Sequence, residues 1–286
     1  MIPSSNLSVA NDQSVDALVK TIRIPPRPGM LADVQRELSN DDPDPKRLSA
    51  IIANDVALSA SLLKLTNSPF FGLRLKATSV DHAVNLIGMK QCGLLMTGLI
   101  ARQAIQIENV SLVKFWDFSA KRAQAMSHLA SRMRICASDM AHTFGLFCDI
   151  GIPLLLERFP RYQKTLEIAG QELSVSFTEV EQAHHNTSHT SIGALMARTW
   201  GLPEDISNAI LLHHNYPVLR DTATPDRVRA LIALALVADF AIHKYHGQEN
   251  MAEWEKGSRL VCDYLGLSSD DLEDRFEELH ELFNQH

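Results

Sequence analysis

Apolar residues recur three and four positions apart along most of the chain, the spacing that places side chains on one face of an α-helix. Segments with the strict alternation of a half-buried β-strand are missing from the sequence. One clear helix is predicted over 57–67, where four leucines fall on one side: Leu58, Leu62, Leu63 and Leu65. The pattern therefore predicts an all-α protein.

Two longer apolar runs lie at Cys92–Ala101 and Ala230–Ile242. Both are shorter than the ~20 residues that a membrane-spanning helix needs. The second run also contains Asp239, a charge that a span would have to bury in lipid. We therefore expect both runs to be buried core helices and expect no membrane partner.

Proline, glycine and capping residues mark where the predicted helices begin and end. Ser79 precedes a periodic segment as an N-cap, and Gly88 ends that segment. Ser176 and Glu179 have the spacing of a capping box, in which each side chain accepts a hydrogen bond from the other residue's backbone amide. Ser14 is predicted to cap a first short helix over 15–23.

The breaks between these segments are short, which favours one continuous helical body with two lobes. We expect a flexible tail at 1–13, an N-terminal helical lobe at 14–110 and a second helical lobe at 111–246. The remaining C-terminal helices, at 247–286, are expected to pack on the body. Their acidic last segment carries an apolar stripe: Leu272, Phe276, Leu279 and Phe283.

Composition limits the classes of partner. The 286 residues are 45% apolar and 21% charged, the balance of a globular protein, and the formal net charge is −7. Such a surface does not attract nucleic acid or anionic lipid over long distances. We therefore expect no nucleic-acid partner.

The cysteines bear on the redox environment. Cys92, Cys136, Cys148 and Cys262 form no C-x-x-C pair and lie in apolar contexts, so free buried thiols are expected rather than disulfides or a zinc knuckle. The first 14 residues contain neither the basic nor the apolar region of a signal peptide. Both observations predict a cytoplasmic protein.

The first half of the chain resembles the HDOD family. The proline turn IPPRPGM is followed by DVALSASLLKLTNSPFFG and then by SVDHAVNLIG. The residues that match the family pattern are Asp55, Leu58, Leu62, Leu63, Asn67, Ser68, Phe70, Phe71, Gly72, Ser79, Ala83, Val84, Ile87 and Gly88. In the second half, FWDFSAKRA, FGLFCDIG and HTSIGALMARTWGLPEDISNAILLHHN resemble helices that HDOD proteins share with HD-type phosphohydrolases.

This resemblance implies a helical bundle with an N-terminal lobe and an HD-like lobe. It also implies a bacterial, non-catalytic regulatory protein of signal transduction, acting as a binding module for protein partners of a signalling pathway. Two alternatives belong to other classes. One is a metal-dependent phosphohydrolase, and the other is a nucleotide-sensing module without turnover.

The metal site of the catalytic relatives is altered in this chain. Where the resemblance calls for two histidines, the chain has Phe118 and Cys148, whereas Asp149 and Asp239 remain. Phenylalanine cannot bind a metal, and a cysteine thiolate favours soft or borderline ions. Two carboxylates alone make a poor transition-metal site, so no cofactor is expected.

Three further histidines, His189, His213 and His214, match the later histidines of two-metal relatives. With Asp149 and Asp239 they could line one cavity, which has three interpretations. It is a polar cluster in which an imidazole neutralises Asp149, because an unpaired buried carboxylate is costly. Otherwise it is a pocket for a small molecule or nucleotide, or a metal site for Mg, Mn, Fe or Zn.

Paired aromatic residues stand at a proline–glycine break, in SPFFGL. We interpret Phe70 and Phe71 as core plugs that lock the first lobe onto the second. The alternative is an exposed partner surface formed by Phe70, Phe71 and Arg74.

Overall fold

The computed structural model describes residues 22, 24, 28–68, 71–105 and 112–284. Every regular element in these residues is a helix, and no strand occurs among them. The predicted all-α fold is therefore confirmed. The expected first helix with its cap Ser14 lies outside the described residues, as does the expected lobe boundary near residue 110.

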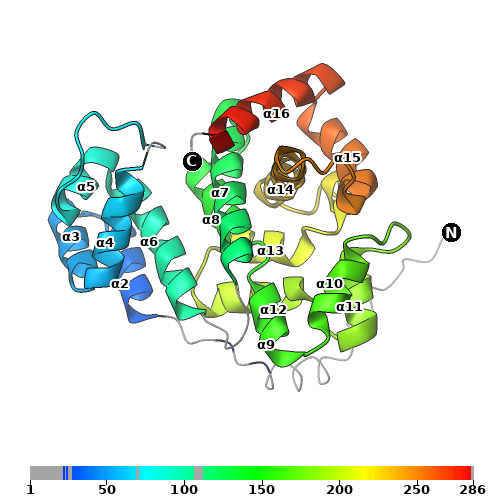
Figure 1. Ribbon diagram of the computed structural model, residues 1–286, viewed down its shortest axis with the longest axis horizontal. Helices are drawn as coiled ribbons and strands as arrows, with labels where there is room; N and C mark the ends of the chain where they lie inside the picture. Colours follow the sequence, from blue (N-terminus) through cyan, green and yellow to red (C-terminus); the bar gives the residue numbers. More distant parts are fainter. Residues whose placement is uncertain (1–21, 23, 25–27, 69–70, 106–111, 285–286) are drawn as a thin grey trace.

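The first group of helices gathers on one side of the molecule, blue to green-cyan in Figure 1. It comprises α2 (Gly29–Leu38), α3 (Pro45–Ala53), α4 (Val56–Thr66), α5 (Val80–Ile87) and α6 (Met89–Ala104).

The second group forms the larger side of the molecule (Figure 1). It comprises α7 (Val113–Met133), α8 (Ser138–Phe147), α9 (Gly151–Arg158), α10 (Tyr162–Ala169), α11 (Phe177–His185), α12 (His189–Thr199), α13 (Glu204–Leu212), the 3₁₀ helix η2 (Tyr216–Arg220), α14 (Asp226–Tyr245), α15 (Ala252–Leu265) and α16 (Ser269–Asn284).

The two groups pack against each other where α6 meets α8. Gly98 permits this close packing, because a Cβ atom built on it would lie 2.8 Å from a methyl group of Leu146. The predicted core run within α6 is buried on one face, since Cys92, Met96 and Ala101 have no exposed surface, whereas Leu94, Leu95 and Leu99 are only partly buried.

The core of the second group is built around α14, which appears nearly end-on in Figure 1. This helix packs against α7, α13, α15 and α16, and its residues from Ala230 to Ala238 are buried. The second predicted core run is therefore confirmed. The stripe on α16 also faces the body: Phe276, Leu279 and Phe283 are buried where α16 packs on α7 and α14.

The helix ends follow the predicted capping chemistry. Ser79 accepts a hydrogen bond from the backbone N–H of His82 at 3.1 Å, and Gly88 ends α5 with φ of +84°. The capping box at the start of α11 is complete: Ser176 accepts from the amide of Glu179, and Glu179 accepts from the amide of Ser176.

One motif residue of the first group closes a loop. The side-chain amide of Asn67 donates to the carbonyl of Ala77 at 2.9 Å, and its oxygen accepts from the N–H of Ala77 at 2.7 Å. These two bonds join the end of α4 to the segment before α5.

Among the described residues, one helical stretch meets the length and hydropathy criteria of a membrane span. It is Ser138–Arg158, which contains α8 and α9, and its mean hydropathy is 1.3. Of this stretch, 67% is buried inside the protein, as in the core helices of folded domains.

Candidate metal centre

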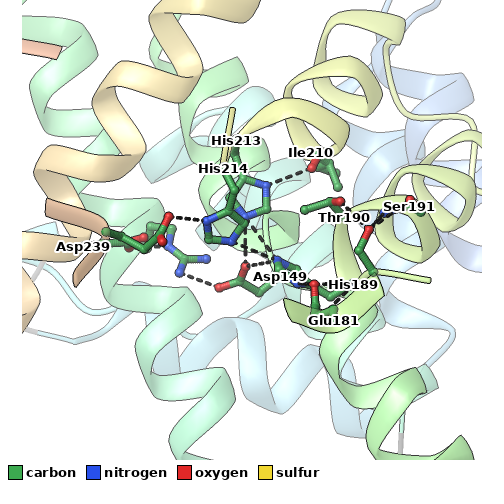
Figure 2. A network of polar contacts seen from close by, with 12 residues as sticks. Asp149, Glu181, His189, Thr190, Ser191, Ile210, His213, His214 and Asp239 are labelled. Atoms are coloured by element: carbon green, nitrogen blue, oxygen red, sulfur yellow. Dashed lines mark hydrogen bonds and ion pairs between the residues drawn. The ribbon is translucent and has the colours of Figure 1, made fainter. Parts of the chain in front are cut away.

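Six polar side chains from separate parts of the second group are among those that line one cavity of about 210 Å³. Figure 2 labels five of them, four of which converge while Asp239 lies to one side. They are Asp149 from the turn between α8 and α9, His189 at the start of α12, His213 and His214 directly after α13, and Asp239 of α14; the sixth is Arg122 of α7. The five residues singled out in the sequence thus lie together, whereas Arg122 was not among them.

A glycine allows Asp149 to approach the histidines. Gly151 begins α9, and a Cβ atom built on it would lie 2.1 Å from the carbonyl oxygen of His189. Any side chain at this position would push the α8–α9 turn away from α12. The glycine that follows the lone acid in FCDIG therefore has a steric role in holding Asp149 beside His189.

Four ligand atoms converge in what we call the histidine cluster, formed by Asp149, His189, His213 and His214. Oδ1 of Asp149 lies 3.4 Å from Nε2 of His189 and 3.3 Å from Nε2 of His213. Nε2 of His189 also lies 3.3 Å from Nε2 of His213 and 3.3 Å from Nε2 of His214. All four atoms lie within 4.8 Å of one another.

The opposite ring nitrogens fix the orientation of all three imidazoles. Nδ1 of His189 bonds to Glu181 at 2.8 Å, and Nδ1 of His214 bonds to Glu253 at 2.5 Å. Nδ1 of His213 bonds to the carbonyl of Ile210 at 2.8 Å. Because carboxylates and carbonyls accept hydrogen bonds, each Nδ1 carries a proton, so each ring, when it is neutral, directs its Nε2 lone pair into the cluster.

This arrangement fits a divalent cation. Zinc–nitrogen and zinc–carboxylate bonds of about 2.0–2.1 Å in tetrahedral geometry place neighbouring ligand atoms about 3.3–3.4 Å apart. Four of the six separations in the cluster are 3.3–3.4 Å, and all six lie within 4.8 Å. Histidine ligands whose other nitrogen donates to a carboxylate or carbonyl are also the usual arrangement around bound metals. The donor set therefore suits a metal, which would be held by one carboxylate and three imidazoles.

The supporting carboxylates are themselves held in place. Glu181 is fully buried and accepts from the hydroxyl of Tyr162 and from the backbone N–H of His189. Glu253 accepts from the hydroxyl of Tyr216 at 2.7 Å and from Lys256 at 2.7 Å. Both acids are absent from the sequence prediction, because their pairing with the histidines depends on how distant helices pack.

Beside the histidine cluster lies an arginine bridge, formed by Arg122, Asp149 and Asp239. Nη2 of Arg122 donates to Oδ2 of Asp149 at 2.6 Å, and Nε donates to Oδ1 of Asp239 at 2.5 Å. Arg122 is only 3% exposed, and its guanidinium lies 4.9 Å from the ring centroid of Phe118. A built-in cation thus joins the two aspartates that the resemblance implied as metal ligands.

The bridge changes the expected role of two residues. Asp149 was expected to be neutralised by an imidazole, but its shortest ion pair is with Arg122. Asp239 was expected to join the histidines, but it lies outside the group of converging ligand atoms and pairs with Arg122. The sequence signal for a buried Arg122 is helical periodicity, because Arg122 falls on the buried stripe of α7 with Ser119, Ala123 and Met126.

The carboxyl groups of Asp149 and Asp239 differ in the direction of their pKa shifts. Burial by itself raises the pKa of Asp149, but Arg122 and the imidazoles of His189 and His213 hold this pKa well below its usual value. Burial raises the pKa of Asp239 to about 6, against the opposing effect of Arg122. Asp149 is therefore the carboxylate that remains charged throughout the ordinary pH range.

The pKa values of His189, His214 and Cys148 are also shifted by their surroundings. Burial opposes the charge on His189, but Glu181 and Asp149 raise its pKa to about 10. Burial, helped by His213, lowers the pKa of His214 to about 4. Burial raises the pKa of Cys148 well above its usual value, and its sulfur is not among the converging ligand atoms. Cys148 therefore remains a buried thiol beside the site.

The predicted partner surface is only partly described. Phe70 lies outside the described residues. Phe71 is half-buried, Arg74 is exposed, and Gly72 has φ of +53°. The assignment of these residues to a partner surface stays a prediction.

Comparison with known proteins gives the following relationships. The profile of the HDOD domain matches residues 24–216. A protein of unassigned function from Treponema pallidum (strain Nichols) is 26% identical over 252 residues, which cover 86% of this chain and 47% of that protein. The chain thus spans about half the length of that relative.

Three solved structures have a similar fold. An HDOD domain protein of unknown function from Geobacter sulfurreducens has a TM-score of 0.69 at 18% identity, covering 95% of this chain and 96% of its own. A candidate phosphohydrolase from Shewanella amazonensis SB2B has a TM-score of 0.71 at 22% identity, covering 94% and 95%. A candidate signal transduction protein from Marinobacter aquaeolei VT8 has a TM-score of 0.74 at 20% identity, covering 96% and 63%.

Proposed function

Because the chain belongs to the HDOD family, we propose that it is a non-catalytic regulatory protein of signal transduction whose HD-like lobe holds a single divalent cation. The cation would be bound by the histidine cluster. The helical body would act as a binding module for protein partners. The expectation of no cofactor thus gives way to its alternative, a divalent metal.

The observation that carries this proposal is the arginine bridge. Two-metal hydrolysis of a phosphate ester uses a second cation about 3.5–4 Å from the first, which binds water and stabilises the leaving oxygen. Here the guanidinium of Arg122 lies between Asp149 and Asp239, at 2.6 and 2.5 Å. A guanidinium pairs with both carboxylates, but it cannot bind and activate water as a metal does.

The histidine cluster supplies the remaining part of the proposal. A bound divalent ion would act as a Lewis acid in principle, but its main contribution here would be to fasten α12 and the end of α13 to the α8–α9 turn. His189, His213 and Asp149 come from these three segments. The chain's own residues then orient the imidazoles through Glu181, Ile210 and Glu253.

Elemental analysis combined with activity assays tests the proposal. The purified full chain is expected to contain about one zinc-class ion, and the variant His189→Ala is expected to lose it. Phosphodiesterase, phosphatase and nucleotidase assays with Mg, Mn, Fe or Zn are expected to show no turnover. Hydrolysis that disappears in Asp149→Ala would instead support the metal-dependent phosphohydrolase.

A second candidate, nucleotide sensing without turnover, is favoured by two unpaired nitrogens. Nη1 of Arg122 and Nδ1 of His243 are buried without a hydrogen-bond partner among the described residues, and both side chains line the 210 Å³ cavity. A buried donor without a partner is costly, and a phosphate oxygen could satisfy it. The cavity is small, so it suits one phosphate group of a larger ligand.

Thermal-shift measurements test this candidate, because a ligand that binds only the folded state raises the melting temperature. Cyclic mononucleotides, cyclic dinucleotides and guanosine polyphosphates are the probes. A shift that is lost in His243→Ala supports nucleotide sensing, and no shift with any of the three classes counts against it.

A further inference from the structure

A second cavity lies between the two helical groups, lined by α4, α6, α7 and α8. Its volume is about 760 Å³. Sites for small organic ligands typically have volumes of about 300–1,000 Å³ and mostly apolar walls. We call this space the interlobe cavity.

Helix α7 separates the interlobe cavity from the candidate metal centre. Phe118 and Arg122 line the metal-centre cavity, whereas Ala120 and Gln124 line the interlobe cavity. Positions two residues apart on a helix point in nearly opposite directions, so the two cavities lie on opposite faces of α7. The interlobe cavity is therefore a separate site.

The wall of the interlobe cavity is mainly aliphatic and aromatic. Leu94, Leu95 and Leu99 of α6 are only partly buried, and Trp116 of α7 also lines the space. Val113, at the start of α7, is 64% exposed. Apolar surface that remains in contact with water gains free energy when an apolar ligand covers it.

The charges around the cavity have one sign. Lys64 in the last turn of α4 and Arg102 in the last turn of α6 are the charged residues among its described lining residues, which include no aspartate or glutamate. Both side chains are exposed, and neither makes an ion pair with a described residue. In a chain of net charge −7, this is a local positive site.

A buried polar atom also lacks a partner here. The ring of His142 lines the cavity, and its Nδ1 is buried without a hydrogen bond to any described residue. Burial lowers the pKa of His142 to about 4, so the ring is neutral at pH 7.

We propose that the interlobe cavity binds an amphiphilic anion, a molecule with one extended apolar chain and one anionic head. The chain lies against the leucines of α6 and against Trp116, and the head pairs with Lys64 and Arg102. The ligand contacts α7 and α8, the two helices that lead to Arg122 and Asp149. This inference does not depend on a metal in the histidine cluster.

Titration calorimetry of the full chain tests the proposal with three probes of equal chain length, each below its micelle concentration. Dodecanoate and dodecyl phosphate carry an anionic head, and 1-dodecanol is neutral. One molecule of either anion is expected to bind per protein molecule. Dodecanol is expected to bind at least tenfold more weakly. Because Lys64 and Arg102 are exposed, binding of the anions should weaken as salt rises.

Matched variants distinguish the residues that bind the ligand's anionic head from those that bind its apolar part. Lys64→Gln with Arg102→Gln should reduce the affinity for both anions to that for dodecanol, whereas Lys90→Gln, an exposed lysine of α6 outside the cavity, should change nothing. Ala120→Trp should fill the cavity and abolish binding of all three probes. Its control, Ala60→Trp, alters an exposed alanine of α4 outside the lining. Denaturation curves of each variant check that it folds.

Several results would overturn the proposal. They are no binding of either anion, equal affinity for dodecanol and dodecanoate, or undiminished binding in a folded Ala120→Trp protein. Binding to anionic lipid vesicles without binding to the monomeric probes would assign the positive site to a membrane surface instead. Anion binding that the double glutamine variant leaves intact would remove Lys64 and Arg102 from the head site.

Discussion

The two oxygens of Asp149 face two different arrangements of charge. Oδ1 faces the histidine cluster, at 3.4 Å from His189 and 3.3 Å from His213. Oδ2 faces the arginine bridge, 2.6 Å from Arg122. On the first side, imidazole nitrogens converge on the carboxylate, as ligands do around an exchangeable ion. On the second side, the cation is a side chain of α7.

The difference has a functional consequence. A bound metal can be lost, exchanged or used to activate water, whereas a guanidinium stays charged at every ordinary pH and has no coordination position to offer. Under the proposed function, the histidine cluster is the half of the site that binds an ion, and the arginine bridge is the half in which a permanent ion pair takes the place of a second one.

Arg122→Met should give the largest effect. It leaves Asp149 and Asp239 without their cation in a buried site, and breaking a buried ion pair in this way costs about 3–5 kcal/mol of unfolding free energy. Urea denaturation measures it. The control is Lys121→Met, in the adjacent pair with Asp117, whose side chain is 58% exposed; exposed pairs contribute about 0–1 kcal/mol. A loss below about 1 kcal/mol for Arg122→Met would contradict the bridge.

Metal removal should come next. An ion present at 100–1,000 times its dissociation constant stabilises the fold by about 3–4 kcal/mol, so a chelator should lower the melting temperature measurably. His189→Ala should melt at the same temperature with and without the chelator. In the control His184→Ala, an exposed histidine outside the cluster, the response should persist. A wild-type protein that does not respond to chelation would remove the ion from the account.

Glu253→Gln tests the supporting carboxylate behind His214. Removing such an outer partner typically weakens metal binding about 10- to 100-fold, which competition with a chromogenic chelator would measure. Glu278→Gln is the matched control, because Glu278 also pairs with a histidine, His128, and with an arginine, Arg132, but lies on α16 away from the cavity. Equal affinities in the two variants would show that Glu253 does not tune the site.

A change of one pH unit should have the smallest effect on ion binding. Without the ion, Glu181 and Asp149 outweigh burial and raise the pKa of His189 to about 10, so a proton competes with the metal. Affinity should rise about tenfold per unit between about pH 7 and 9. The pKa of His214 is lowered to about 4, so this ring adds no slope in that range.

The same shift predicts the stability of the ion-free protein. Because the pKa of His189 is raised in the folded state, its protonated ring adds to the free energy of unfolding. This contribution is fully present below about pH 6.5 and is lost as the pH rises through about 10. Saturating metal should abolish this loss. Ion affinity that is flat between pH 7 and 9 would show that His189 is already neutral.

Local chemistry made the fold predictable from sequence. The cap at Ser79, the capping box of Ser176 and Glu179 and the buried runs in α6 and α14 all depend on neighbouring residues or on helical periodicity. Asp149 and the three histidines were identified through the family resemblance, and their convergence required the packing of distant segments.

The arginine bridge could not be predicted from the sequence, and the reason is physical. Arg122 and Asp239 are 117 positions apart, and a charged residue in an amphipathic helix normally indicates an exposed face. Periodicity places Arg122 on the stripe of α7 that is buried, but only the packing of α14 against α7 shows that Asp239 is its partner. The same holds for Glu181 and Glu253, whose partners lie 8 and 39 positions away.

A crystal structure of the protein grown with zinc, with anomalous scattering recorded at the zinc edge, tests the central claim most directly. The account predicts one peak per chain, bonded to Asp149, His189, His213 and His214, with Arg122 still between Asp149 and Asp239. Two peaks a few ångströms apart, with Arg122 displaced and Asp239 bound to the second ion, would contradict it.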